Sequence, residues 1–273
     1  MGTSLRLATQ TAGTRYQHPF ENNQNPNCTP GVQLRLPLPT PVWKQSKPVV
    51  SKTMHAKTIG SIQVKGGAGR STVSTNLAGE LSKLGKTVLI DCDMPQGTSA
   101  SWFAVRQQKG KDGNLVADTA TNHRELVAKM QQYAYADYIV LDGPPRIAEL
   151  TRAILVLADI CLVPVGASAA EIWATNDLLE LIEEAKKVKP VNTRMVWTRY
   201  RPHTRLAQGL TELAKKDLGL LALGTSLGMR VAYMEALGEG LTVAELTDAS
   251  AKVEARFLTE EVQRLLGKGK IIK

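Results

Sequence analysis

The sequence predicts a doubly wound α/β domain, with a mostly parallel sheet of seven or eight strands, helices on both faces and a disordered tail in front. Three observations support this prediction. From Lys57 onward, short apolar runs alternate with stretches that have a helical hydrophobic period. The apolar runs are continuous, which is typical of parallel strands buried on both faces. The first 53 residues show neither pattern.

Composition favours an ordinary globular chain. Of the 273 residues, 43% are hydrophobic and 22% are charged. The sequence contains no apolar run of about 18 residues, so no transmembrane helix is predicted. The N-terminus lacks the pattern of a secretory signal. The three cysteines are too scattered for a zinc site or a disulfide framework, so we expect free thiols in a reducing cytoplasm. The net charge of +9 suggests a polyanionic partner: nucleic acid, a phosphate ligand or an anionic membrane.

Residues 1–53 are predicted to be a flexible basic tail. They contain seven of the 13 prolines, and they carry six Lys or Arg residues but only one acidic residue, Glu21. Such a segment cannot bury enough apolar surface to offset the entropy lost on ordering. Two alternatives remain open: a basic arm that contacts DNA or a partner, and a misassigned start, with translation beginning at Met54. Residues 54–273 form the predicted folded domain.

The order of the elements follows from the periodicity. The predicted strands are Ile59–Val64, Val88–Ile90, Tyr138–Leu141, Ile160–Val165 and Met195–Trp197. Two helices between them are predicted from apolar side chains at helical spacing: Val73, Leu77, Leu81 and Leu84 in one, and Leu178, Leu181, Ile182 and Ala185 in the other.

A glycine-rich segment, KGGAGRST from Lys65 to Thr72, joins the first strand to its helix. Small residues let consecutive backbone N–H groups surround a phosphate, and the helix N-terminus adds partial positive charge. The Ser71 hydroxyl can reach Mg²⁺, and the Arg70 cation can reach the terminal phosphates. The ordinary G-x-x-x-x-G-K pattern is not met, because Val64 stands at its first glycine and Arg70 at its lysine. A plain glycine turn is the alternative.

Five landmarks in the right order make the chain resemble the ParA/MinD family of deviant-Walker ATPases. The loop is similar to that family's KGGxGKS/T. VLIDCDMPQG, from Val88 to Gly97, resembles its D-x-D-P-Q-G segment with Met94 inserted, and YIVLDGPP, from Tyr138 to Pro145, resembles its Walker B strand. The remaining landmarks are DICLVPVGAS at 159–168 and RVAYMEALGEGLTVAEL at 230–246. The likeness covers about residues 57–266 and implies a P-loop NTPase fold with ATP and Mg²⁺ as cofactors.

The resemblance also implies residue roles. The loop residues Gly66, Gly67, Ala68, Gly69, Arg70, Ser71 and Thr72 would hold the phosphates. Lys65 would reach the phosphates of a partner subunit in an ATP-bound homodimer. Asp93 would orient or activate the attacking water. Ser71 would bind Mg²⁺, Asp142 would hold a water bound to the ion, and Asp91 would support this shell. Thr198 and Arg199 would lie near the purine. Lys65, Arg70 and Asp93 are thus the expected catalytic residues.

Two departures from the family pattern predict slow hydrolysis. A planar guanidinium at position 70 is not equivalent to a compact ammonium at a tight phosphate site. The inserted Met94 lengthens the turn after Asp93, and a displacement of about 1 Å can cost about 100-fold in rate. The alternative to an active ATPase is therefore a nucleotide-dependent DNA-binding or regulatory switch with little turnover.

Partition ATPases of this kind bind DNA without sequence preference, through cations on the protein surface. The residues expected to do so here are Arg199, Arg201, Arg205, Lys215, Lys216 and Arg230; a solvated basic face is the alternative. The implied partner is a ParB-like centromere-binding protein or a cargo adaptor, and the implied location is the nucleoid in a bacterial cytoplasm. A MinD-like membrane helix at residues 262–273 is disfavoured, because a Gly-Lys-Gly segment interrupts its apolar face.

Overall fold

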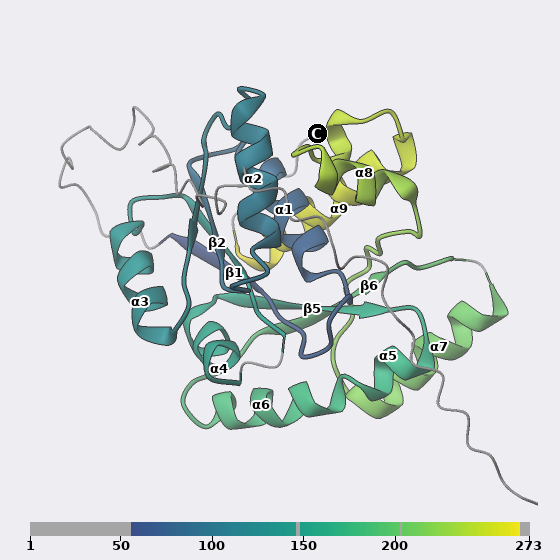
Figure 1. The fold of residues 1–273 in the computed structure, drawn as a ribbon. Helices are drawn as coiled ribbons and strands as arrows, with labels where there is room; N and C mark the ends of the chain where they lie inside the picture. Colours follow the sequence, from purple (N-terminus) through teal and green to yellow (C-terminus); the bar gives the residue numbers. More distant parts are fainter. Residues whose placement is uncertain (1–55, 146–147, 203, 268–273) are drawn as a thin grey trace, which may run out of the picture. The chain divides into compact units, whose positions relative to one another are not determined.

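The computed structural model describes residues 56–145, 148–202 and 204–267. These residues form a parallel sheet with helices on both faces, which confirms the predicted fold class (Figure 1). The predicted tail, its boundary at Met54 and the last lysines of the chain lie outside the described residues. Within the described ranges, every helix is too short or too polar to span a bilayer.

Strands and helices alternate along the described chain. The strands are β1 Lys57–Ser61, β2 Thr87–Asp91, β3 Leu115–Thr119, β4 Tyr138–Asp142, β5 Ile160–Gly166 and β6 Thr193–Thr198. The helices are α1 Arg70–Leu81, α2 Thr98–Gln108, α3 His123–Gln132, α4 Ala148–Leu157, α5 Ala169–Trp173, α6 Asn176–Lys186, α7 Arg205–Leu218, α8 Val231–Gly238 and α9 Ala249–Leu265, with a 3₁₀ turn, η2, at Val243–Glu245.

The strand order is β3-β2-β4-β1-β5-β6, and every neighbouring pair is parallel. Strand β1 lies between β4 and β5, so the chain moves out from it towards both edges of the sheet. Open parallel sheets bind ligands at the carboxyl ends of the strands beside such a switch point. The loop after β1 therefore lies where the fold provides a ligand site.

The described sheet has six strands, not the predicted seven or eight. The segment after α7 runs beside β6 but forms only isolated bridges, at Ala222 and Gly228. Between these bridges the amides of Gly224 and Thr225 donate to the Glu261 carboxylate, not to β6. Glu261 on α9 thus binds two amides that could otherwise pair with β6 in a seventh strand.

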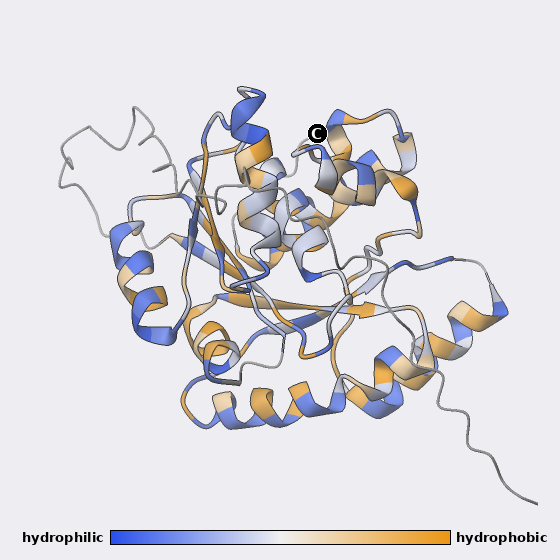
Figure 2. Cartoon of the chain, in the orientation of Figure 1, coloured by the Kyte–Doolittle hydropathy of each residue, from blue (hydrophilic) through white to orange (hydrophobic). Residues whose placement is uncertain are grey.

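The strands read as continuous apolar runs because each one serves two cores. In β2, Val88 and Ile90 belong to one core and Leu89 to the other, and Figure 2 shows strongly hydrophobic colour along the central strands. Helices α1, α2, α8 and α9 cover one core, and α3 to α7 cover the other (Figure 1). Cys92 and Cys161 are free thiols in this interior.

Two details of the predicted elements were wrong or missing. Leu84 is 52% exposed, because α1 ends at Leu81 and the next residues form a turn. Strand β3 was not predicted, since its apolar run is only three residues long and it pairs with β2 alone. The predicted buried stripe of α6 is confirmed at all four positions.

A buried ion pair fastens α2 to the C-terminal part of the fold. Arg106 is 5% exposed and donates to Glu245 over 2.7 Å and to the Gly240 carbonyl over 3.2 Å. Burial raises the pKa of the Glu245 carboxyl, but the hydrogen bonds and charge of Arg106, with the Thr242 amide, outweigh it and lower the pKa to about 2. Glu245 also completes a capping box with Thr242.

We expect Glu245→Gln to destabilise the protein at pH 7 by about 1–2 kcal/mol, a figure reduced for the remaining solvent contact of this side chain. Because the folded pKa lies below the ordinary 4.5, the stabilisation is present above pH 4.5 and is lost as the pH falls towards 2. Urea unfolding at a series of pH values from 7 down to about 2 measures it, across the window set by the two pKa values. Glu239→Gln, which removes the exposed pair with Lys109, should change little. A pH-independent loss in Glu245→Gln would contradict the assignment.

Candidate functional site

The loop between β1 and α1 adopts a backbone that only glycine accepts easily. Gly67 and Gly69 have φ values of 76° and 100°, in the left-handed region that costs other residues roughly 1–2 kcal/mol. A Cβ at Gly69 would also lie 3.1 Å from the Thr198 side chain. Gly69 is the N-cap of α1 and offers no capping side chain. The first-turn amides of α1 are therefore left for a ligand.

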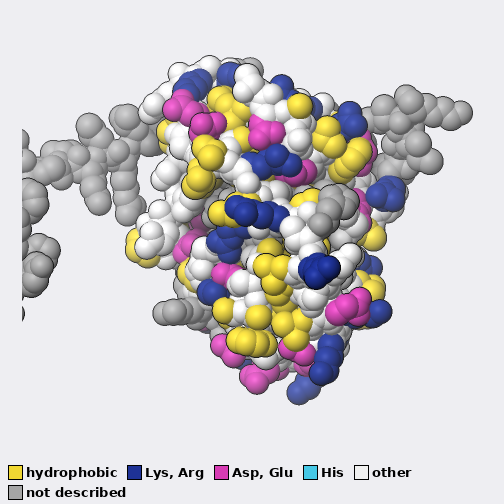
Figure 3. All heavy atoms as spheres, turned by 90° about the vertical axis from the view of Figure 1, so that its right-hand side faces the viewer, with side chains coloured by type: hydrophobic (Ala, Val, Ile, Leu, Met, Phe, Trp, Pro, Cys, Tyr) yellow, Lys and Arg dark blue, Asp and Glu magenta, His cyan; other side chains and the backbone are white. Residues whose placement is uncertain are grey.

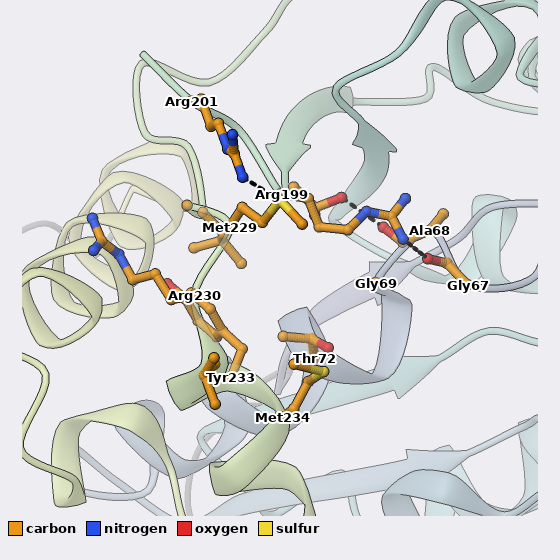
Figure 4. A pocket seen from close by; sticks show the side chains of 14 residues that line it. Gly67, Ala68, Gly69, Thr72, Arg199, Arg201, Met229, Arg230, Tyr233 and Met234 are labelled. Carbon is orange, nitrogen blue, oxygen red and sulfur yellow. Dashed lines mark hydrogen bonds between the residues drawn. The ribbon is translucent and has the colours of Figure 1, made fainter.

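The end of β6 holds this loop from a position about 130 residues further along the chain. The Thr198 hydroxyl donates to the Ala68 carbonyl over 2.8 Å, and the Arg199 guanidinium donates to the Gly67 carbonyl over 2.6 Å. Arg199 has a left-handed φ of 51°, and Figure 4 shows its side chain extending towards Gly67. Both residues thus lie against the loop; their predicted place near a purine stays a prediction.

Lys65 is engaged within its own chain. Its ammonium lies 2.9 Å from a carboxylate oxygen of Glu171 on α5, and Arg199 lies 3.2 Å from the same oxygen. The other oxygen of Glu171 is buried without a hydrogen-bond partner in the described structure. Sequence reasoning missed Glu171, because nothing local distinguishes it from a surface acid at the start of a helix. Whether Lys65 also serves a partner subunit stays a prediction.

Arg70 is buried, with 6% of its surface exposed. One terminal nitrogen donates to the carbonyls of Gln63 and Lys65, over 2.5 and 2.9 Å, and the other donates to Asp93 over 3.3 Å. The sequence predicted that this cation would reach the terminal phosphates. Arg70 does line a pocket over the start of α1, but its guanidinium already donates to two loop carbonyls and one carboxylate.

Asp91 and Asp142 end neighbouring strands in register and are fully buried. Asp91 accepts the backbone amides of Asp93 and Ala100, both over 2.9 Å, so it positions the loop after β2 and the start of α2. Asp142 accepts the hydroxyls of Ser74 and Ser99. Burial and the charge of Asp91 raise the pKa of Asp142 to about 6. Burial likewise raises the pKa of Asp93, although Arg70 opposes the shift.

Two pockets meet at the glycine loop and share Gly67, Gly69 and Thr72. The first, about 490 Å³, lies between the loop, the end of β6 and α8, as Figure 4 shows. The second, about 430 Å³, lies over the start of α1 and the loop after β2. Its further lining residues are Gly66, Arg70, Ser71, Asp93, Gln96, Thr98, Pro145 and Leu237. The first pocket is mostly apolar, with arginines among its lining residues. The second is lined by residues with hydroxyl groups and by one carboxylate residue, Asp93.

The structure separates the six cations predicted to bind DNA. Arg199, Arg201 and Arg230 line the first pocket, and Arg230 is tied to Glu254 over 2.8 Å. Arg201 donates to the Met229 sulfur. The other three, Arg205, Lys215 and Lys216, are exposed at the two ends of α7.

The α8 side of the first pocket was not predicted as part of the site. Met229, Val231 and Met234 are more than 60% exposed there, and Tyr233 lies beside them. The sequence offered a signal, since 230–246 was one of the five landmarks. Periodicity alone does not show that α8 faces the loop, because that contact joins residues far apart in the chain.

The donor set fits Mg²⁺ that arrives with a phosphate ligand. Within the described ranges, no group of three or more His, Cys, Asp or Glu side chains is arranged to hold a metal ion. Mg²⁺ is usually held by one or two protein oxygens together with waters and substrate phosphates. Ser71 lines the second pocket, and its hydroxyl is such an oxygen.

Comparisons with known proteins agree with this geometry. A family model for the CobQ/CobB/MinD/ParA nucleotide binding domain matches residues 60–243. The chain is 28% identical to "Maintenance of carboxysome distribution protein A" of Halothiobacillus neapolitanus over 77% of this chain and 95% of that protein. It is 30% identical to the chromosome-partitioning ATPase Soj of Thermus thermophilus over 72% and 92% of the two chains.

Solved structures support the fold. An ATP complex of McdA from Cyanothece matches with a TM-score of 0.65 and 19% identity, over 80% of this chain and 99% of that one. The MinD cell division protein of Aquifex aeolicus matches with a TM-score of 0.62 and 18% identity, over 80% and 100%.

We expect Gly69→Ala to lower the free energy of unfolding by about 1–2 kcal/mol, because alanine is strained at this φ and its Cβ approaches Thr198. Gly66→Ala is the matched control, since a Cβ there meets nothing within 4 Å; we expect a change within about 0.5 kcal/mol. Urea unfolding without nucleotide compares the two. Equal losses would show that the backbone at Gly69 is not the constraint.

Proposed function

Because the chain belongs to the CobQ/CobB/MinD/ParA nucleotide-binding family, we propose that it is a ParA-type ATPase. In this proposal ATP binding drives dimerisation and non-specific DNA binding, and partner-stimulated hydrolysis reverses both. The cycle segregates or positions a plasmid, a chromosome or another cargo on the nucleoid of a bacterial cell. Relatives named for chromosome partitioning and for carboxysome distribution support the coarse function, while the cargo is left open.

The observation that carries the proposal is the pair of pockets that share the glycine loop. A nucleoside triphosphate has an apolar base at one end and anionic phosphates at the other. The apolar pocket beside Thr198 and Arg199 suits the base and ribose, and the pocket over the start of α1 suits the phosphates. Because the two pockets share Gly67, Gly69 and Thr72, one ligand could occupy both.

Two polar side chains of the second pocket, Ser71 and Asp93, have proposed roles in phosphoryl transfer. Such a reaction depends mainly on positioning and on neutralising charge. Ser71 would bind Mg²⁺, with Asp142 behind it through water; when bound, the ion would neutralise phosphate charge. Asp93 would orient the attacking water, since it borders the pocket and Asp91 fixes its backbone.

Lys65 provides the proposed link between nucleotide and dimerisation. Lys65 forms an ion pair with Glu171 at the start of the glycine loop, and its side chain is partly exposed. Exchanging this carboxylate for the phosphates of a second subunit would cost little, because Arg199 remains to neutralise Glu171. A ligand shifts a conformational equilibrium only by contacts that differ between the two states, and Lys65 would supply that difference.

The proposed DNA contacts lie on α7, whose exposed cations are not used by the pocket. Lys215 and Lys216 occupy its last turn and Arg205 its first. Figure 3, which views the side of the molecule that lies to the right in Figure 1, shows Lys and Arg side chains gathered across the middle, between apolar patches. Backbone phosphates attract such cations without sequence preference. The cargo adaptor would be a ParB-like protein that acts on the DNA-bound dimer.

A second candidate function is a nucleotide-dependent switch with little turnover. The contact between Arg70 and Asp93 favours it, because the proposed water-orienting carboxylate is paired with a buried cation. MinD-like membrane placement is less supported. Val262 and Leu266 of the predicted membrane segment are buried in the core, and residues 268–273 lie outside the described ranges.

We expect ATP with Mg²⁺, but not ADP, to shift the protein to a dimer in size-exclusion chromatography with light scattering. Lys65→Ala should bind ATP and remain a monomer. Lys83→Ala, which removes an exposed lysine paired with Glu80, should dimerise like the unmodified chain. An elution volume that ATP does not change would exclude the shared-nucleotide dimer.

Reversing the charges at the end of α7, in Lys215→Glu with Lys216→Glu, should weaken DNA binding in the ATP state and reduce the slope of log K against log salt by about two. Fluorescence anisotropy on a random-sequence duplex over a salt series measures both effects. The matched control is Lys186→Glu with Lys187→Glu, the same charge change at the exposed end of α6. If both pairs weaken binding equally, net charge alone explains the result and α7 is not the contact.

A further inference from the structure

Arg70 occupies an unusual position for a cation at the head of a phosphate loop. It is the first residue of α1, yet its guanidinium is 6% exposed and turned back against the carbonyls of Gln63 and Lys65. We propose that Arg70 is a positioning residue that clamps Asp93, holding its carboxylate until an anion in the phosphate pocket replaces it on the guanidinium. The inference rests on the proposed ATPase function and adds a link between nucleotide binding and the release of Asp93.

The hydrogen-bond pattern of the guanidinium supports a clamp. The two carbonyls take both hydrogens of one terminal nitrogen, which fixes the plane of the group. The other terminal nitrogen is then directed at Asp93, whose Oδ2 lies 3.3 Å away. Arg70 therefore joins the loop before α1 to the loop after β2 through one rigid group.

Asp93 can leave the clamp only by rotating its side chain. Its amide donates to Asp91 over 2.9 Å, and its carbonyl accepts from the Gly97 amide over 2.7 Å. The backbone is therefore held at both ends of the residue. Asp93 and Arg70 border the same 430 Å³ pocket, so a rotated carboxylate would stay within reach of a ligand bound there.

The charges of Arg70, Asp93 and an incoming phosphate determine when the clamp opens. A buried guanidinium that loses its carboxylate without a replacement is strongly destabilised. A phosphate in the same pocket is a replacement, and the Nε of Arg70 is a buried donor with no partner among the described residues. Nucleotide binding and the release of Asp93 thus become one exchange of anions on one cation.

A lysine at this position would not form the same clamp. Its ammonium is a single point charge on a flexible stem, whereas the guanidinium presents a planar fork to three acceptors at once. A lysine that kept the two loop carbonyls would have to give up Asp93. Arg70→Lys therefore preserves the charge and removes the clamp, which makes it the informative substitution.

The test is steady-state ATP hydrolysis with Mg²⁺ after ATP binding has been measured by calorimetry. We expect Arg70→Lys to tighten ATP binding by about tenfold or more, the scale of one charge-assisted hydrogen bond that the nucleotide no longer has to displace from Asp93, while kcat at saturating ATP changes by less than about threefold. Arg106→Lys is the matched control, because Arg106 is an equally buried arginine paired with Glu245 outside the site. It should leave the affinity for ATP unchanged.

A second variant separates a clamp from a structural role. In the otherwise unmodified chain, Asp93→Asn should tighten ATP binding about threefold, since no carboxylate competes for Arg70, and in the Arg70→Lys background it should add no further gain. That affinity gain tests the clamp even if Arg70→Lys does not fold. An ATP affinity at or below that of the unmodified chain in a folded Arg70→Lys overturns the clamp, as does an affinity unchanged by Asp93→Asn. Absence of ATP binding by the unmodified chain overturns the proposed function, and the clamp with it.

Discussion

The site depends on donors from this chain that satisfy the carbonyl groups of the glycine loop. Four of these oxygens accept side-chain hydrogen bonds: those of Gln63 and Lys65 from Arg70, that of Gly67 from Arg199 and that of Ala68 from Thr198. In a planar trans peptide the N–H points away from the C=O, so binding the carbonyls on one side presents the following amides on the other. The loop can bind an anion through its amides because its carbonyl oxygens already accept hydrogen bonds from side chains of this chain.

Local features of the site could be predicted from sequence, and long-range ones could not. Continuous apolar runs, the glycine segment and Asp91 and Asp142 at strand ends are each written in a few consecutive residues, and each lies where the pattern predicted. Glu171 depends on α5 lying beside the loop, which no local pattern records. The strand number failed for the same reason, because Glu261 on α9 takes amides that an edge strand would have used. The roles predicted from the family resemblance stay predictions.

The charges around the loop form a linked set. Lys65 and Arg199 share one oxygen of Glu171, so two cations face one carboxylate and the mouth of the loop keeps an excess positive charge for an anion. At the other end, Arg70 faces Asp93. Burial raises the pKa of Asp93, and Arg70 opposes that shift by favouring the charged form. A phosphate group that enters between these pairs meets cations that are held in position but not fully neutralised.

The arginine at position 70 changes what nucleotide binding has to accomplish. With a point charge on a flexible stem, the loop and the carboxylate after β2 could move independently. With a guanidinium fixed by Gln63 and Lys65, the position of Asp93 is set by the same group that would meet the phosphates. The bound nucleotide would then determine both the shape of the loop and the availability of the water-orienting carboxylate. Such coupling would make the carboxylate of Asp93 available only while an anion occupies the pocket, so that hydrolysis would be confined to the nucleotide-bound state.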